Sequence, residues 1–313
     1  MTRAITFPGQ GSQAVGMGRD LAAAFPVARE VFQEVDEALK QKLSLLMFEG
    51  PSDTLTLTEN AQPALMAVSL AVMRVLEREC GFSFTRHAAF VAGHSLGEYS
   101  ALAASGALGL ADTARLLKRR GQAMQRAVPV GEGAMAALLG IELEGATKLA
   151  QEAAQGAVCA IANDNGAGQI VISGAKAAID RAIALAPNYG IKRAMPLPVS
   201  APFHSPLMEP AAREMEDALG TVTIAPPKVP VIANVTAAPV SDPETIRKLL
   251  VDQVTGLVRW RETVERFKGL GVTQALEAGS GKVLTGLAKR IDRDLEALAI
   301  GLPAEIEAFG KTL

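Results

Sequence analysis

The stretch that decides the fold is AAFVAGHSLG, which runs from Ala88 to Gly97. Its first five residues are apolar and predict a buried strand, and a helix is expected to begin near Leu96. The turn between them fits the pattern G-x-S-x-G, whose glycines allow a sharp strand-to-helix turn that exposes the Ser95 hydroxyl. The N–H of Leu96, at the helix N-terminus, is then free to bind an oxyanion. The alternative is a glycine-rich turn with an incidental serine.

Strands and helices alternate along most of the chain, which is typical of a parallel α/β sheet with right-handed crossovers. Strands are predicted at residues 4–7, 88–92, 229–233 and 273–277, and helices at 17–39, 63–79, 208–219, 243–253 and 261–270, with another after Lys282.

The middle of the chain has a different order of predicted strands and helices. Residues 134–139, 158–162, 169–173 and 194–197 are predicted strands, and 143–155 and 175–186 are predicted helices. The resulting order, βαββαβ, is that of the ferredoxin-like split unit, which closes its own sheet. We therefore expect a small subdomain at residues 130–198, inserted into a large one formed by residues 1–129 and 199–313.

The composition excludes several classes of protein. Of the 313 residues 49% are hydrophobic and 20% charged, which is typical of a globular protein. A net charge of −2 and only 4% aromatic residues argue against nucleic-acid binding. Cys80 and Cys159 are too few for a disulfide framework or a zinc site. No stretch reaches the roughly 20 apolar residues that span a bilayer, and no signal peptide is evident, so we expect a cytoplasmic protein. The glycosylation pattern at Asn234-Val235-Thr236 is then unused.

A serine nucleophile needs a base, and the chain has only three histidines. His87 lies in a polar segment before the strand, and His94 lies in the turn itself, where its side chain should point away from that of Ser95. His204 lies in the irregular loop 201–206, and loops on a rigid scaffold often carry catalytic groups. Elimination favours His204 as the general base, with a hydrogen-bonded structural histidine as the alternative.

No acidic residue is well placed to complete a hydrolase triad. The acids between Ser95 and His204 include Asp112, Asp164 and Asp180, which fall in or beside helices or in the small subdomain. Because the third group serves to orient the imidazole, a backbone or amide carbonyl could take its place.

Two glycine-rich loops imitate nucleotide-binding motifs. Residues 9–14 nearly fit the dinucleotide fingerprint, but the acid at the right spacing, Glu30, falls in a predicted helix. The alternative use of this loop is to hold the side chain of Gln10 at the mouth of the sheet. Residues 279–282 lack the first glycine and the magnesium-binding hydroxyl of a phosphate loop, so that match fails.

The run Lys118-Arg119-Arg120 is predicted to end a helix, where positive charge is favoured. A solvated face is the simple interpretation of such a run. An arginine turned toward Ser95 would instead bind a carboxylate through two parallel hydrogen bonds.

Taken together, these segments resemble the malonyl-CoA:acyl carrier protein transacylase family of acyltransferases. The matching stretches are FPGQGSQ (7–13), QPAL (62–65), AGHSLGEY (92–99), Arg120-Gly121, MPLPVS (195–200) with His204, and GKVLT (281–285). They span the chain in the family's order. The resemblance implies an α/β-hydrolase-like parallel-sheet core with an inserted ferredoxin-like subdomain, in agreement with the division above.

The resemblance also implies a role for seven residues. Ser95 would be the acylated nucleophile, His204 its base, and Arg120 the ligand of the malonyl carboxylate. Gln10 and the Leu96 N–H would form the oxyanion hole. The backbone carbonyl of Gln253 would orient His204, although Gly256-Leu257 beside it departs from the family's pattern. Phe203, directly before the base, resembles the ring that crowds an α-methyl branch in malonyl-selective domains.

The implied activity is transfer of a malonyl group from coenzyme A to the phosphopantetheine thiol of acyl carrier protein, through a malonyl-serine, for fatty acid or polyketide synthesis. No cofactor or metal is expected, and the chain is expected to act as a monomer. A serine esterase of the α/β-hydrolase type and a non-enzymatic dinucleotide-binding module are the alternatives. Because carrier proteins are acidic and this chain is near neutral, a local basic patch is expected at Lys192-Arg193 or Arg247-Lys248.

Overall fold

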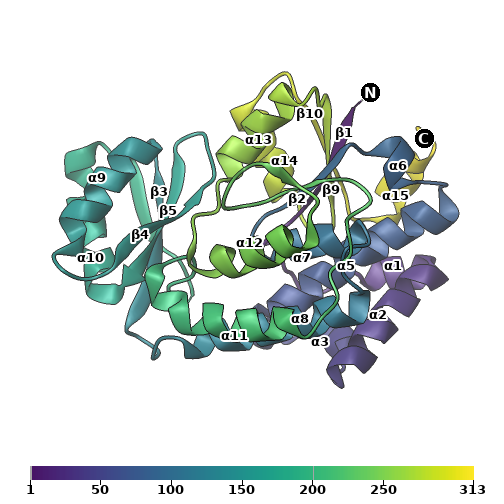
Figure 1. Cartoon of the computed structure of the whole chain (residues 1–313), viewed down its shortest axis with the longest axis horizontal. Coiled ribbons are helices and arrows are strands. Elements are labelled where there is room, and N and C mark those ends of the chain that lie inside the picture. Colours follow the sequence, from purple (N-terminus) through teal and green to yellow (C-terminus); the bar gives the residue numbers. More distant parts are fainter. Residues whose placement is uncertain (1, 200) are drawn as a thin grey trace.

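The computed structural model describes residues 2–199 and 201–313, so the last residue of the MPLPVS stretch, Ser200, lies outside the described part. A large α/β body makes up most of the molecule, and a smaller α/β unit projects from one side of it (Figure 1). None of the described helices is both long and apolar enough to cross a bilayer.

The large body is built on a six-stranded sheet with the order β10-β9-β1-β2-β7-β8. All neighbouring pairs are parallel except β7 and β8, which are antiparallel. The strands are β1 (Arg3–Phe7), β2 (Phe90–Gly93), β7 (Val231–Ile232), β8 (Pro239–Val240), β9 (Gln274–Ala278) and β10 (Glu296–Ile300). Because β1 and β2 are adjacent and parallel, their carboxyl ends place the loops that start at Pro8 and His94 side by side.

Helices cover both faces of this sheet (Figure 1). They are α1 (Arg19–Ala24), α2 (Pro26–Leu39), α3 (Leu43–Glu49), α4 (Ser52–Thr56), α5 (Thr58–Glu79), α6 (Phe84–His87), α7 (Leu96–Ala104), α8 (Leu110–Arg126), α11 (Glu209–Gly220), α12 (Pro243–Thr255), α13 (Trp260–Gly269), α14 (Val283–Ile291) and α15 (Pro303–Gly310). Two short 3₁₀ turns lie at Ala186–Tyr189 and Pro206–Met208.

Two helix predictions were wrong. The helix expected at residues 17–39 is two helices, since Phe25 is extended (φ −126°, ψ 116°), the conformation that a following proline imposes on its neighbour. The run Lys118-Arg119-Arg120 does not end a helix, because α8 continues to Arg126. It passes through Gly121, where a Cβ atom would lie 2.5 Å from the Cα of Glu59, so the glycine serves close packing on α5 rather than termination.

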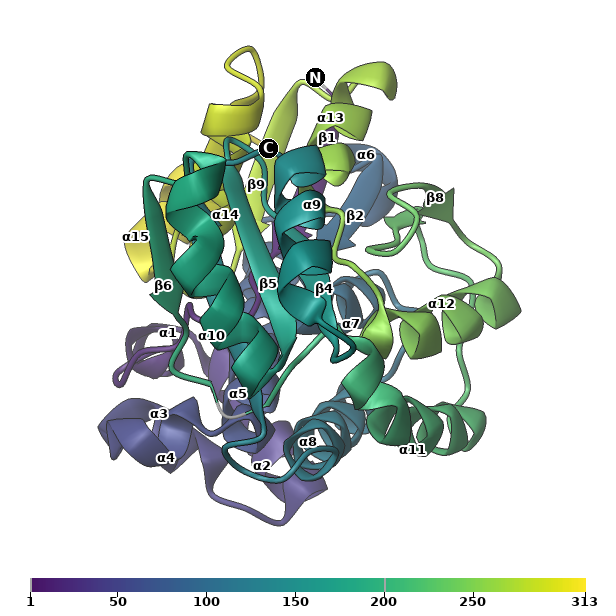
Figure 2. The ribbon, with the colours of Figure 1, turned by 90° about the vertical axis from the view of Figure 1, so that its left-hand side faces the viewer.

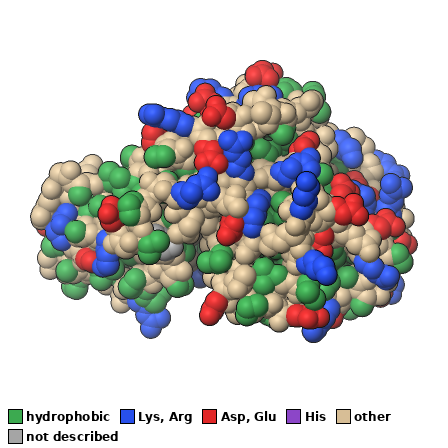
Figure 3. Space-filling model, turned by 90° about the horizontal axis from the view of Figure 1, so that it is seen from below, with side chains coloured by type: hydrophobic (Ala, Val, Ile, Leu, Met, Phe, Trp, Pro, Cys, Tyr) green, Lys and Arg blue, Asp and Glu red, His purple; other side chains and the backbone are tan. Residues whose placement is uncertain are grey.

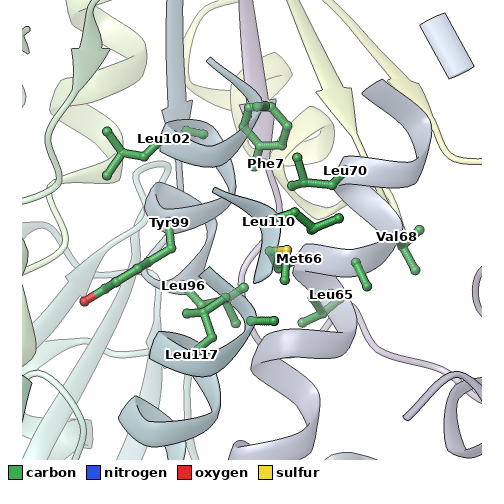
Figure 4. Packing of buried hydrophobic residues seen from close by; sticks show 14 of the residues in the cluster. Phe7, Leu65, Met66, Val68, Leu70, Leu96, Tyr99, Leu102, Leu110 and Leu117 are labelled. Atoms are coloured by element: carbon green, nitrogen blue, oxygen red, sulfur yellow. The ribbon is translucent and has the colours of Figure 1, made fainter. Parts of the chain in front are cut away.

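The main core joins β1 to α5, α7 and α8 (Figure 4). Nearly every residue of α5 from Thr58 to Leu76 is buried, so this helix is enclosed rather than amphipathic. Leu96 and Tyr99 of α7 are no more than 1% exposed and pack in the same cluster. The turn that carries Ser95 is therefore anchored on its helical side in the main core.

The small unit has its own sheet and core. Its elements are β3 (Gly133–Leu139), α9 (Leu143–Ala154), β4 (Cys159–Asp164), β5 (Gln169–Ala175), α10 (Lys176–Leu185) and β6 (Arg193–Pro196). The strands form an antiparallel sheet with the order β4-β5-β3-β6, and α9 and α10 cover one face of it (Figure 2). Ala136, Leu138, Leu149, Ile170 and Ile172 lie in the apolar cluster between sheet and helices.

One end of β4 is fastened to the large body. The N–H of Asp164 donates to the carbonyl of Val258 (3.0 Å), and the N–H of Val258 donates to the carbonyl of Ala162 (2.9 Å). The buried carboxylate of Asp164 pairs with Arg261 at 2.9 Å. These bonds bring the turn after β4 to the carboxyl ends of the large sheet, beside Ser95.

Candidate active site

Ser95 occupies a sharp turn between β2 and α7. Its backbone has φ 52° and ψ −110°, a conformation that residues other than glycine rarely adopt. A Cβ atom on Gly93 would lie 1.9 Å from the carbonyl oxygen of Gly97, and one on Gly97 would lie 2.3 Å from the carbonyl oxygen of Phe7. Both glycines of the motif are therefore required by close backbone contacts.

The side chain of Asn234 stabilises this turn through two hydrogen bonds to its backbone. Its Oδ1 accepts a hydrogen bond from the backbone N–H of Ser95 (2.7 Å), and its Nδ2 donates to the carbonyl of Gly93 (2.7 Å). Asn234 is 1% exposed, so it is also unavailable as a glycosylation site. The sequence analysis singled out Asn234 only as part of that glycosylation pattern, and nothing in its neighbours indicated that it would bond the backbone of Ser95.

The imidazole of His204 lies against the serine hydroxyl. Its Nε2 is 2.8 Å from Ser95 Oγ, and its Nδ1 donates to the backbone carbonyls of Gln253 (2.9 Å) and Gly256 (3.2 Å). Burial, and secondly the positive charge of Arg120, lower the pKa of His204 to about 3. The ring is therefore neutral at neutral pH, with its Nε2 lone pair directed at the hydroxyl.

The other two histidines are engaged elsewhere. His87 ends α6, where its Nδ1 accepts from the N–H of Ser83 (2.9 Å). The Nε2 of His94 lies 2.9 Å from Oδ1 of Asn165, in the turn that follows β4, and its ring lies 5.7 Å from the Trp260 ring. His94 thus links the serine turn to the small unit.

The three acids considered for a triad bond other partners. Asp112 pairs with Arg115 and Asp180 with Lys176, both at exposed positions, and Asp164 pairs with Arg261. The partners of His204 Nδ1 are therefore backbone carbonyls, and none of these three carboxylates bonds it.

Arg120 reaches the same hydroxyl from α8. Its Nη2 donates to Ser95 Oγ (3.1 Å) and to Gln253 Oε1 (2.8 Å), and its Nη1 donates to Gln62 Oε1 (2.8 Å). Arg120 is 1% exposed, and burial lowers the pKa of its guanidinium, although arginine stays charged in proteins. All three of these acceptors are neutral oxygens. Gln62 lies in the QPAL stretch, but its partner was not predicted.

Gln253 contributes twice. Its backbone carbonyl accepts from His204 Nδ1, while its side-chain amide accepts from Arg120 and donates to the carbonyl of Ser95 (3.1 Å) and to Oε2 of Glu98 (2.7 Å). The side-chain bonds and the involvement of Glu98 were not predicted from the chain.

These groups line a cavity of about 230 Å³ between the large body and the small unit. Gln10, Leu96 and Met124 line it from the large body, and Met135 and Asn163 from the small unit. Gln10 Oε1 accepts from the hydroxyl of Thr58 (2.8 Å), so its amide is oriented at the mouth of the sheet. The N–H of Leu96, the first residue of α7, has no partner within the helix.

Phe203 lies on the apolar side of the cavity. Its half-buried ring packs on Met135, Ala162 and Val171 of the small unit, near Leu197 and Val199 of the connection after β6. All seven residues to which the sequence assigned a role therefore lie in or directly beside one cavity.

Neither glycine-rich rival loop has the geometry of a nucleotide site. Glu30 lies in α2, not at the end of a strand, and no helix begins directly after residues 9–14. At residues 279–282, the N-terminus of α14 is occupied by the carboxylate of Glu277, which accepts from the N–H groups of Leu284 (3.1 Å) and Thr285 (2.7 Å). An internal carboxylate holds the position that a phosphate would need.

Comparison with known proteins gives a consistent result. Residues 5–278 match the family model described as an acyl transferase domain. The chain is 45% identical over 311 residues to the malonyl CoA-acyl carrier protein transacylase of Bacillus subtilis, covering 99% of this chain and 96% of that one.

Two solved structures extend the likeness to the fold. The acyl-carrier-protein-S-malonyltransferase of Bartonella henselae has a TM-score of 0.98 and 58% identity, covering 100% of this chain and 99% of that one. A malonyl-transacylase in complex with a type II PKS acyl-carrier protein has a TM-score of 0.96 and 42% identity, with full coverage of both chains. The chain belongs to the malonyl-CoA:acyl carrier protein transacylase family of acyl transferases.

Proposed function

We propose that this chain is a malonyl-CoA:acyl carrier protein S-malonyltransferase that works through a malonyl ester of Ser95. The observation that carries the proposal is the convergence of two groups on one hydroxyl: His204 Nε2 at 2.8 Å and Arg120 Nη2 at 3.1 Å. A neutral imidazole supplies a base, and a buried guanidinium supplies a partner for the free carboxylate of malonyl.

In the first half-reaction, His204 Nε2 takes the proton of Ser95 as Oγ attacks the thioester carbon. The N–H of Leu96 and the Gln10 loop stabilise the oxyanion of the tetrahedral intermediate. When the C–S bond breaks, the thiolate of coenzyme A takes the proton from His204, and malonyl-Ser95 remains. In the second half-reaction His204 takes the proton of the phosphopantetheine thiol, sulfur attacks the ester, and Ser95 recovers its proton as it leaves.

Substrate binding assists the base in this mechanism. The charge of Arg120 is one of the two main causes of the depressed pKa of His204. A malonyl carboxylate paired with Arg120 neutralises much of that charge, so the pKa of His204 rises when the correct acyl group is bound. Gln253 orients the ring through a carbonyl and adds no negative charge of its own.

We propose that residues 1–129 and 199–313 form an α/β-hydrolase-like subdomain and that residues 130–198 form a ferredoxin-like one. The six-stranded, mainly parallel sheet with Ser95 at the carboxyl end of β2 supports the first assignment. The βαββαβ order with the strand order β4-β5-β3-β6 supports the second.

For the carrier protein, Lys192-Arg193 is the better of the two basic candidates. The Arg247 guanidinium donates to the carbonyls of Leu219 and Val222, and Lys248 pairs with Asp252. Lys192 and Arg193 are exposed at the start of β6, whose far end leads into the cavity. On the face seen in Figure 3, charges of both signs are intermingled, so a local patch is a better anchor for an acidic partner than the whole surface.

The test is intact-mass spectrometry of the wild-type chain and of Ser95→Ala after mixing with malonyl-CoA, followed by addition of phosphopantetheinylated carrier protein. We expect a malonyl adduct on the wild type only, and its transfer to the carrier thiol. Loss of the adduct to water instead would favour the serine esterase. An adduct of equal yield on Ser95→Ala, or none on either chain, would contradict the proposal.

A further inference from the structure

Glu98 is a buried carboxylate that the mechanism above does not use. It lies three residues after the nucleophile on α7 and is 2% exposed. Burial raises the pKa of Glu98 to about 7, against the lowering effect of its bonds to Gln253 and Asn234 and of the Arg120 charge. A buried acid is costly unless hydrogen-bonded, so its position calls for an explanation.

Among the described residues, the two hydrogen bonds that the Glu98 side chain accepts come from Gln253 and Asn234, which both bond to the segment at Ser95. Its Oε2 accepts from the side-chain Nε2 of Gln253 (2.7 Å) and from the backbone N–H of Asn234 (3.1 Å). Gln253 is the residue whose backbone carbonyl holds His204 and whose amide oxygen holds Arg120. Glu98 therefore touches none of the reacting atoms but is bonded to a residue that contacts both partners of the serine.

The Gln253 amide has one orientation that satisfies all its neighbours. Its oxygen faces a donor, Arg120 Nη2, and its nitrogen faces two acceptors, Glu98 Oε2 and the carbonyl of Ser95. A rotation of the amide by half a turn would put N–H groups against the guanidinium and an oxygen against two oxygens. The amide thus bridges the buried guanidinium of Arg120 and the buried carboxyl group of Glu98, and its bond to Glu98 Oε2 is shorter than its bond to the carbonyl of Ser95.

We propose that Glu98 is a positioning residue that, by holding the Gln253 amide in this orientation, sets the guanidinium of Arg120 for the carboxylate of the acyl group. The inference rests on the proposed function, because it assigns Glu98 to the selection of malonyl over an acyl group without a carboxylate. What the Gln253 amide needs is an oxygen acceptor at the end of a side chain of the length of glutamate. The negative charge is secondary.

The distinction between reach and charge gives a matched pair of variants. Glu98→Asp keeps the charge but withdraws the acceptor from Gln253 by about 1.5 Å, the length of one C–C bond. Glu98→Gln removes the charge but keeps an amide oxygen at the same distance. Ser100→Ala is the control, since Ser100 is on the same helix, fully buried, and its hydroxyl has no hydrogen-bond partner among the described residues.

The experiment measures kcat/KM for acylation by malonyl-CoA and by acetyl-CoA in the wild type and the three variants, with thermal unfolding to verify folding. We expect Glu98→Asp to lower the malonyl-to-acetyl ratio roughly tenfold, the usual effect of losing one hydrogen bond to a charged group. We expect Glu98→Gln to lower it clearly less, and Ser100→Ala to leave it unchanged.

Three results would overturn the inference. The first is the reverse order, with Glu98→Gln worse than Glu98→Asp, which would make Glu98 a counter-charge only. The second is an unchanged ratio in Glu98→Asp, whether both rates fall together or neither falls, which would make its role structural. The third is a wild type that is not acylated by malonyl-CoA at all, which would remove the proposed function along with this inference.

Discussion

The two walls of the cavity differ in what they present to an acyl group. The polar wall (Gln62, Ser95 and Arg120) belongs to the large body, and its side chains are tied together by hydrogen bonds of 2.8–3.1 Å. The apolar wall (Met135, Leu197, Val199 and Phe203) belongs to the small unit and the connection after it, and Phe203 packs there without a hydrogen bond to the reacting groups among the described residues. One wall can recognise charge and the other bulk, because only the first holds a buried cation.

The largest effect is expected on the polar wall, from Arg120→Ala. Acetyl cannot pair with the guanidinium, and sites built on such pairing reject the analogue that lacks the partner by about 10⁴–10⁵-fold. We therefore expect malonyl transfer to fall strongly while acetyl transfer stays the same or improves, measured as kcat/KM for each thioester. A fall by the same factor for both substrates would show that Arg120 supports the structure and does not read charge.

Removal of the base is expected to affect every acyl group alike. Without His204 the serine hydroxyl is a weak nucleophile, so His204→Ala should lower kcat by about 10²–10⁴-fold for malonyl, methylmalonyl and acetyl. His94→Ala, measured beside it, removes a ring that bonds Asn165 and not the serine. If His94→Ala were equally damaging in a folded protein, the assignment of the base would be wrong.

The raised pKa of the buried Glu98 predicts that the stability of the protein depends on pH. The pKa of Glu98 is about 7 in the folded protein against 4.5 as its ordinary value, so the unfolded chain gives up this proton first. Protonated Glu98 therefore contributes to the free energy of unfolding. The contribution is complete below pH 4.5 and is lost as the pH rises through about 7, by about 3 kcal/mol at most. Arg120, Tyr99, His204 and His94 are further charged or titratable side chains of the same region, and the comparison with a variant of Glu98 alone separates its contribution from theirs.

Glu98→Gln removes that dependence. We expect the free energy of unfolding in urea to fall between pH 5 and pH 8 in the wild type by more than it does in the variant. A difference between the two proteins that stays constant from pH 5 to pH 8 would contradict a raised pKa at this residue.

A smaller effect is expected from the apolar wall. Phe203→Ser opens space beside the base, so methylmalonyl transfer should rise relative to malonyl transfer by roughly tenfold, the scale at which packing of a single methyl group discriminates. Competition between the two thioesters for the enzyme gives the ratio directly. If the ratio does not move while the protein stays folded, the ring only fills the junction between the large body and the small unit.

The smallest effect is expected from salt. Discharge to an acidic carrier protein should weaken more with ionic strength than acylation by malonyl-CoA does, and the double variant Lys192→Ala, Arg193→Ala should reduce that difference. The matched control is Lys248→Ala, at a cation that is already paired with Asp252. Equal salt dependence of both half-reactions would argue against a basic patch at the start of β6.

The sequence predicted best what local pattern determines. The sharp turn at Ser95 follows from two glycines between an apolar run and a helix. The hypothesis that His204 is the base follows from the small number of histidines. The helix break at Phe25 and the continuation of α8 through Gly121 were missed, since one depends on a proline's effect on its neighbour and the other on close contact with α5.

The supporting residues could not be found from local pattern because their partners are distant in the chain. Asn234 lies 139 positions from the serine whose backbone it holds, and Gln62 lies 58 positions from Arg120. Glu98 is close to Ser95 in sequence, but its role depends on Gln253, 155 positions away. No spacing rule connects such residues in the sequence. Only the folded structure brings them together around the turn at Ser95.

The central step of the proposed mechanism is the loading of Ser95 with an acyl group that is selected by its carboxylate. The most direct measurement is intact-mass spectrometry of the wild-type chain after brief mixing with equal concentrations of malonyl-CoA and acetyl-CoA, with Ser95→Ala beside it. We expect a malonyl adduct almost exclusively, located on Ser95 by peptide mapping and absent from the variant. Equal loading of the two acyl groups, or an adduct that persists in Ser95→Ala, would contradict it.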